Sequence, residues 1–140
     1  MPASGADSGA TETPAAPRGQ SLATTAETLY LVNLLLVPGV AFALLLWLYW
    51  KNIGTAPPLA RCHLRQTVAG SVWAGVLLIA ANALILALGG YDAPGTWVIL
   101  VLYFVSCHAA LVLLGVLGLA KAMAGQPYRY PLIGRPCDAG

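Results

Sequence analysis

The stretch VAGSVWAGVLLIAANALILAL, residues 68–88, decides the fold because it carries no charge over a length that suits a membrane. Similar charge-free runs cover residues 29–50 and 97–120. An α-helix rises about 1.5 Å per residue, so roughly 20 apolar residues cross the hydrocarbon core of a bilayer. The three runs therefore predict an all-α fold, an integral membrane bundle of three transmembrane helices.

Composition also indicates a lipid environment for most of the chain. Hydrophobic residues make up 59% of the 140 residues and charged residues 9%, and the mean hydropathy is +0.75. A soluble domain is typically about 25% charged. The net charge of +2 is too small to indicate a nucleic acid partner. The partners we expect are the lipid bilayer and other membrane protein subunits.

The positions of Lys and Arg predict the orientation. Of the seven, one lies before the first run, at Arg18, and the others lie within residues 51–65 and 121–135. None lies between the second and third runs. Cation-rich segments stay in the cytoplasm. With three spans, this predicts an N-terminus outside, a cytoplasmic C-terminus and a multi-pass location in the bacterial inner membrane.

The runs divide the chain into three segments. Residues 1–27 are rich in Ala, Ser, Thr, Pro and Gly, which predicts a disordered N-terminal tail. Residues 28–125 form the transmembrane domain, in which Pro38 predicts a kink in the first helix. Residues 126–140 form an interfacial C-terminal segment on the cytoplasmic side.

Two polar segments flank the predicted spans on the cytoplasmic side and are candidates for an interaction site. One opens the second span, and the other follows the third span, held extended by Pro127 and Pro131. Plain anchoring at the lipid headgroups is the simpler interpretation, because Arg and Tyr suit that layer. We also expect a clasp, in which Gln66 or His63 contacts residues 128–131. The candidate interaction residues are His63, Gln66, Tyr128, Arg129, Tyr130 and Arg135.

These segments carry a resemblance. The pair His63 and Gln66 at the start of the second span, with Tyr-Arg-Tyr-Pro-Leu at 128–132, resembles a family of small bacterial membrane proteins of unknown function. That family is described as similar to the chloroplast inner-envelope import component. The resemblance covers roughly residues 29–135 and implies a three-span fold. Arg61 and Arg65 stand where the family often has acidic residues. Protein translocation enters only as an analogy.

A buried polar group is predicted in the middle of the membrane. His108 lies halfway along the third run, and Asn82 and Ser106 are expected at a similar depth. Helical side chains lean towards the helix N-terminus, so the tips of His108 and Asn82 converge. A hydrogen bond between these two would join the helices. A proton or substrate path is the functional alternative, because ionisable groups in a membrane are costly.

No catalytic or cofactor site can be assigned. His63 and His108 lie at different depths, so one chain cannot ligate haem through both, although sharing His108 with another chain stays open. Cys62, His63, Cys137 and Asp138 have poor spacing for zinc. The cysteines, three in number, form no CxxC pair, and no disulfide framework is expected. We therefore expect neither metal nor cofactor.

The sequence favours a non-catalytic membrane protein over an enzyme. The leading hypothesis is an accessory or assembly subunit of a larger membrane complex. An oligomeric translocation or transport component is the alternative, and a redox-complex subunit is the second alternative.

Overall fold

The computed structural model describes residues 15–137, which form helices and no strands. The helices are α1 (Gln20–Leu35), α2 (Val40–Asn52), α3 (Pro58–Ala87), α4 (Thr96–Leu102), the π-helix η1 (Tyr103–His108) and α5 (Ala109–Met123). The expected all-α class is confirmed for this part of the chain.

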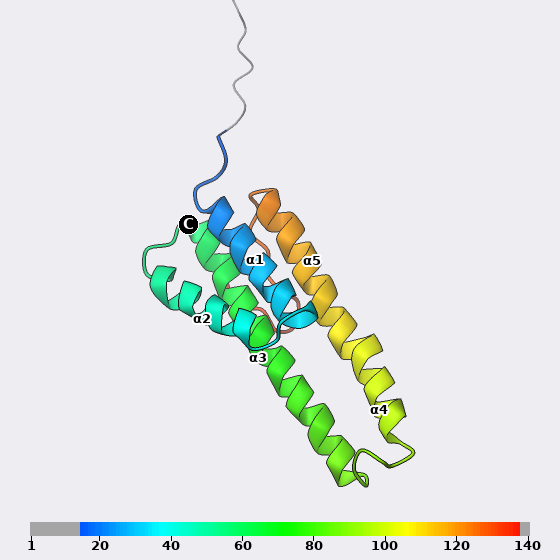
Figure 1. Ribbon diagram of the computed structural model, residues 1–140. Coiled ribbons are helices and arrows are strands. Elements are labelled where there is room, and N and C mark those ends of the chain that lie inside the picture. The colour runs from blue at the N-terminus through cyan, green and yellow to red at the C-terminus, as the bar shows by residue number, and fades with distance from the viewer. Residues whose placement is uncertain (1–14, 138–140) are drawn as a thin grey trace, which may run out of the picture.

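Two long helices form the frame of the molecule. One is α3, and the other is the continuous rod of α4, η1 and α5, which runs antiparallel beside it (Figure 1). Both are long and apolar enough to cross a membrane. Only 17% and 11% of their most apolar windows are buried inside the protein, so neither is the core helix of a soluble fold. Their apolar side chains face outward instead, as a lipid environment requires.

The first apolar run is not a third continuous span. It is broken at residues 36–39, and Pro38 and Gly39 separate two helices of 16 and 13 residues. The sequence predicts a kink at Pro38 within one helix. The structure has two helices instead, and the chain reverses its direction between them (Figure 1). Each helix is shorter than the roughly 20 residues that a span needs. Three spans are therefore not confirmed.

Contacts at the start of α1 show how far the chain turns back. A Cβ added at Gly19 would lie 3.0 Å from that of Ala60, near the start of α3. Gln20 Nε2 donates to the carbonyl oxygen of Met123, the last residue of α5. The start of α1, the start of α3 and the end of α5 therefore lie at one end of the molecule. We call this the clasp end, and α1 with α2 the half-length hairpin.

The tip of the half-length hairpin is stabilised by a side chain. Asn33 is 8% exposed, and its Oδ1 accepts a hydrogen bond from the backbone N–H of Gly39 at 3.1 Å. Gly39 has a φ of 86°, a conformation that glycine adopts without strain. The Gly39 N–H has no helical partner at this break, and the Asn33 side chain supplies one.

The core lies at the clasp end, where the hairpin, the long helices and the C-terminal segment meet (Figure 1). Its buried members are Ala26, Tyr30, Leu45, Ala56, Ala60, Leu64 and Tyr130. Part of the expected tail belongs to this core, because residues 20–27 are helical and Ala23, Ala26 and Glu27 are buried. The remainder of that tail, residues 1–14, lies outside the described part of the chain.

Candidate functional site

A buried polar cluster lies at the clasp end, beneath the C-terminal segment. It is centred on Glu27 of α1 and His63 of α3, whose side chains are both fully buried. His63 Nδ1 lies 2.6 Å from Glu27 Oε1. The Tyr130 hydroxyl donates a hydrogen bond to Glu27 Oε2 at 2.5 Å. Three separate segments of the chain therefore meet at one carboxyl group.

The hydrogen bonds fix how many protons the Glu27–His63 pair holds. His63 Nε2 lies 3.0 Å from the carbonyl oxygen of Gln126, which can only accept, so Nε2 carries a hydrogen. The short contact between Nδ1 and Glu27 Oε1 needs one more proton, on either the ring or the carboxyl. Both arrangements leave the pair with no net charge, which is how a dry interior tolerates ionisable groups.

Tyr130 is held as a hydrogen-bond donor. It is 1% exposed, and its burial raises the pKa of the phenol well above the usual value. The neighbouring Glu27 carboxyl raises that pKa further. The hydroxyl therefore keeps its proton and can stabilise the Glu27 carboxyl group.

Glycines on α3 and α5 make room for the α1 side chains of the cluster. A Cβ at Gly118 would lie 2.5 Å from Glu27 Oε2, and one at Gly115 would lie 2.7 Å from the Tyr30 ring. A Cβ at Gly70 would lie 2.9 Å from the same ring. The small residues in the long helices thus serve the close approach of side chains from the half-length hairpin.

Gln66 holds the C-terminal segment, as the expected clasp requires. Its Oε1 accepts hydrogen bonds from the backbone N–H of Arg135 at 3.1 Å and of Tyr130 at 3.4 Å. Its Nε2 donates to the carbonyl oxygen of Arg135 at 2.5 Å. One amide thereby satisfies three backbone groups of a loop, which Gly134 closes by donating to the carbonyl oxygen of Tyr130. The predicted contact between Gln66 and residues 128–131 is confirmed.

A disulfide joins Cys62 of α3 to Cys137, next to the Gln66 contact. This corrects the expectation that the cysteines form no disulfide. The count of three was misleading, because it leaves Cys107 free while the other two pair across a sequence separation of 75 residues. No local spacing could have shown this pairing, because folding of the C-terminal segment onto α3 creates it.

The other candidate interaction residues lie on or beside this segment. The Tyr128 ring is 5.8 Å from that of Tyr130, centre to centre. Arg129 is exposed, and its Nε donates to the carbonyl oxygen of Gly134 at 3.4 Å. The side chain of Arg135 is also exposed. The candidates therefore form two groups. His63, Gln66 and Tyr130 are buried and hold the C-terminal segment in place. Arg129 and Arg135 are exposed on the outer side of that segment.

The predicted pair of Asn82 and His108 is not among the hydrogen bonds of the described residues. Asn82 Oδ1 instead accepts from the Tyr91 hydroxyl at 2.7 Å, and its Nδ2 donates to the carbonyl oxygen of Leu78. Ser106 is exposed, and His108 is half-buried against the Phe104 ring. The pairing was expected from helix depth alone, which does not specify the direction of each side chain around its helix.

Glu27 is the site residue that the sequence analysis missed. The composition of residues 1–27 predicts a disordered tail whose last position is Glu27, and a carboxylate in such a tail needs no buried partner. One signal was present, since it is the one acidic residue within the stretch from Thr13 to Tyr91. A lone carboxyl next to an apolar run needs a buried partner once that run packs, and His63 is that partner.

The fold and site together define a membrane-associated, all-helical protein whose polar groups join its half-length hairpin and C-terminal segment to its long helices. Residues 15–137 contain no group of three or more His, Cys, Asp or Glu residues that could hold a metal ion. The chain belongs to the magnetosome magnetite crystal formation protein family, whose model matches residues 19–136. That match includes every helix of the described residues and the C-terminal segment as far as residue 136. Neither a curated protein nor a solved structure matches the chain. The expected likeness to the chloroplast import component is not shown.

Proposed function

We propose that this chain is a non-catalytic accessory protein of the membrane in which magnetite crystals form, acting through assembly with other membrane subunits. The observation that carries the proposal is the family match over residues 19–136. The buried cluster supports a structural role for its groups, because both oxygens of Glu27, both ring nitrogens of His63 and the Gln66 amide are hydrogen-bonded within the protein.

The proposal includes a revised topology. Helix α3 and the rod Thr96–Met123 are the two spans, both termini lie in the cytoplasm, and the half-length hairpin enters the membrane from that side and returns. The distribution of cations supports this arrangement. All seven Lys and Arg residues fall in segments at or next to the clasp end: Arg18, Lys51, Arg61, Arg65, Lys121, Arg129 and Arg135. The loop at the far end, residues 88–95, has none, as the positive-inside rule requires.

The partner surface is the outer side of the C-terminal segment. Leu132 stands fully exposed at its tip with a φ of 67°, a conformation uncommon for any residue but glycine. The exposed Arg129 and Arg135 lie on either side of it in the sequence. An apolar tip between two cations suits a membrane partner that presents an apolar pocket near carboxylates. The Gln66 contacts support this surface from below by holding the loop.

Assembly is favoured over direct contact with mineral because the chain is poor in carboxylates. It has five Asp and Glu residues in all, and the described part has Glu27, which is buried, and Asp92, which lies in the far loop. Carboxylate oxygens are the side-chain groups that would be expected to bind hard iron cations. We therefore assign the influence on crystals to the organisation of other membrane proteins.

Complementation tests this function. The full chain, carrying a fluorescent tag, is expressed in a magnetite-forming bacterium that lacks its own member of the family, and crystal sizes are measured by electron microscopy. We expect the wild-type chain to reach the crystal-bearing membrane and to restore crystal size, and Leu132→Asp to reach the membrane without restoring it. A wild-type chain that reaches that membrane and leaves the crystals unchanged would contradict the proposal.

A further inference from the structure

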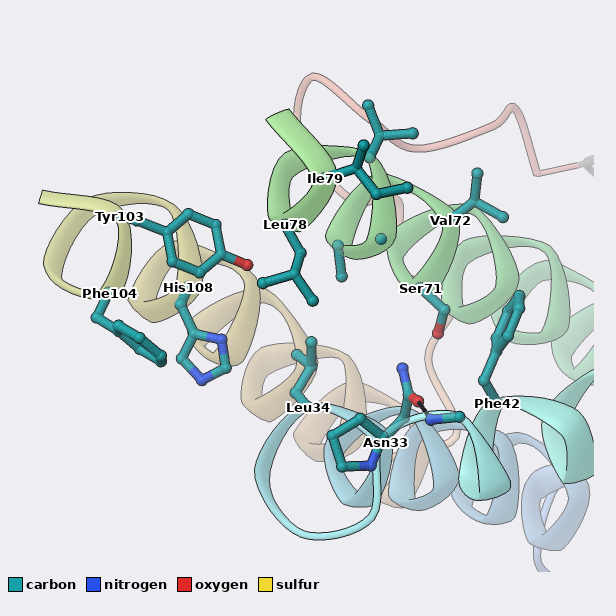
Figure 2. Close-up of a pocket in the computed structure, with 15 residues that line it drawn as sticks. Asn33, Leu34, Phe42, Ser71, Val72, Leu78, Ile79, Tyr103, Phe104 and His108 are labelled. Atoms are coloured by element: carbon teal, nitrogen blue, oxygen red, sulfur yellow. Dashed lines mark hydrogen bonds between the residues drawn. The ribbon is translucent and has the colours of Figure 1, made fainter. Parts of the chain in front are cut away.

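A second feature lies outside the clasp end, where the tip of the half-length hairpin meets α3 and η1. A groove of about 610 Å³ opens there, half enclosed and almost wholly apolar (Figure 2). Its walls include Phe42 of α2, Val72, Gly75 and Ile79 of α3, and Tyr103, Phe104 and His108 of η1. None of these residues belongs to the polar cluster described above.

Two polar side chains line this groove, and one of them, Ser71, carries a buried hydroxyl without a partner among the described residues. Ser71 is 5% exposed, and its hydroxyl has no hydrogen bond within the described structure. Asn33 uses its oxygen for Gly39, which leaves its amide N–H₂ directed towards the Ser71 side of the groove (Figure 2). A helical Ser commonly bonds the carbonyl four residues earlier, as Thr67 does with His63. A buried donor that stays unpaired is costly, so the Ser71 hydroxyl indicates a ligand acceptor, and the Asn33 amide lies beside it as a second donor (Figure 2).

The depth of these donors restricts the ligand. Ser71 lies in the middle third of α3, roughly 20 Å from Pro58 at 1.5 Å per residue. His108 lies similarly far along the rod Thr96–Met123. The groove is therefore near the middle of a hydrocarbon core about 30 Å thick. Phospholipid ester carbonyls lie at the edges of that core, and a fatty acid carboxylate would carry a charge into it at high cost.

We propose that this groove binds a neutral, lipid-soluble ring carbonyl compound of the isoprenoid quinone class. One ring carbonyl accepts from the Ser71 hydroxyl and the Asn33 amide. The ring packs against Phe42, which lies beside Ser71 and Asn33, and aromatic rings favour offset or edge contacts (Figure 2). Tyr103 and Phe104 line the other end of the groove, where they contact the apolar tail. The apolar tail leaves through the open side into lipid. A volume of about 610 Å³ suits a ligand of this size.

Titration with decylubiquinone tests the site directly. The purified full chain in phosphatidylcholine nanodiscs is titrated while quenching of tryptophan fluorescence is followed, since Trp73 neighbours the groove residue Val72 on α3. We expect saturable binding by the wild type. Ser71→Ala should weaken it by about three- to tenfold, the size of one lost hydrogen bond. Ser106→Ala is the matched control, because Ser106 is exposed and outside the groove, and binding should not change.

A blocking variant keeps the test independent of folding. A Cβ at Gly75 would meet no atom within 4 Å, so there is open space for a side chain at this position, and Gly75→Leu would occupy part of the groove. We expect it to abolish binding while the circular dichroism spectrum and the melting temperature stay those of the wild type. Decylubiquinone that fails to saturate, or that binds Gly75→Leu as well as the wild type, would overturn the proposal. If dioctanoylglycerol at the same concentration as decylubiquinone displaces it equally well, the groove binds ester lipids. If the wild type forms an oligomer that only Gly75→Leu loses, the groove binds a second copy of the chain. Either result would also overturn the quinone proposal.

Discussion

Glu27 and His63, 36 residues apart in the sequence, share one proton across 2.6 Å in a site from which water is excluded. Through this contact α1 is joined to α3, although α1 is too short to cross a membrane. Because Tyr130 and Gln126 bond the same pair, the C-terminal segment depends on it as well. The contact therefore couples the half-length hairpin, the long helices and the C-terminal segment.

Removing one member of this pair should destabilise the protein strongly. Glu27→Ala leaves His63 buried without its partner, and breaking a buried pair costs about 3–5 kcal/mol. The free energy of unfolding in detergent measures the loss. The double variant Glu27→Leu with His63→Leu should lose less than the sum of the single variants Glu27→Leu and His63→Leu, because it leaves no unpaired group. Additive losses would show that the two side chains act independently.

Gly118 should tolerate no side chain. Gly118→Ala would place a Cβ 2.5 Å from Glu27 Oε2, and the α1 helix or the carboxyl would have to move. We expect a loss of about 1–3 kcal/mol, typical of overpacking. Gly75→Ala is the control, because no atom lies within 4 Å of its added Cβ. The melting temperatures of the two variants give the comparison, and equal values would refute the packing of Glu27 against α5.

Gln66 and Tyr130 should act as one unit. Gln66→Leu leaves three backbone groups of the loop without their partner, and Tyr130→Ala removes the ring that anchors that loop in the core. Each change should release the C-terminal segment, seen as faster cleavage by trypsin after Arg129, which is followed by Tyr130. The double variant should be little worse than either single one. If the double variant is cleaved faster by the sum of the two single increments, Gln66 and Tyr130 act independently.

In the oxidised protein, the Cys62–Cys137 disulfide should secure a segment that also folds without it, as it must in the cytoplasm where we place the clasp end and where thiols are kept reduced. It closes a loop of 75 residues, and such a closure stabilises a chain by about 4 kcal/mol in the loop-entropy view. Reduction should lower the melting temperature while leaving the helical circular dichroism spectrum intact, because Gln66 and Tyr130 still hold the loop. The variant with Ser at both positions should match the reduced protein. Global unfolding on reduction would contradict this account.

The sequence predicted the apolar helices well and the first run poorly, for a physical reason. The runs at 68–88 and 97–120 lie almost wholly within Pro58–Ala87 and Thr96–Met123, two helices that are long and apolar enough to cross a membrane, so composition and length suffice to identify them. The first run has the same composition, yet Pro38 and Gly39 let the chain reverse. Two contacts stabilise the reversed chain. The Gly39 N–H donates a hydrogen bond to Asn33 at the turn, and Glu27 pairs with His63, which joins α1 to α3. Both contacts are tertiary, and neither is visible in hydropathy.

The site was predicted in part because side-chain chemistry limits the choices. An extended segment with two prolines needs partners for its backbone groups, and a nearby Gln66 can both donate and accept, so their contact followed. The Cys62–Cys137 pairing did not follow, because it depends on where the chain end lies after folding. The predicted pairing of Asn82 with His108 rests on depth alone. In the structure Asn82 accepts a hydrogen bond from Tyr91, which the short loop after α3 places close to it.

Cysteine accessibility at Ala16 tests the half-length hairpin most directly. In a chain with Cys62, Cys107 and Cys137 changed to Ser, Ala16→Cys places a thiol at an exposed position just before α1, and Asp92→Cys places one in the exposed far loop. Intact cells are treated with a membrane-impermeant maleimide before and after permeabilisation. We predict that Asp92→Cys is labelled in intact cells and that Ala16→Cys is labelled only after permeabilisation. Labelling of Ala16→Cys in intact cells would place the N-terminus outside, restore three full spans and contradict the account.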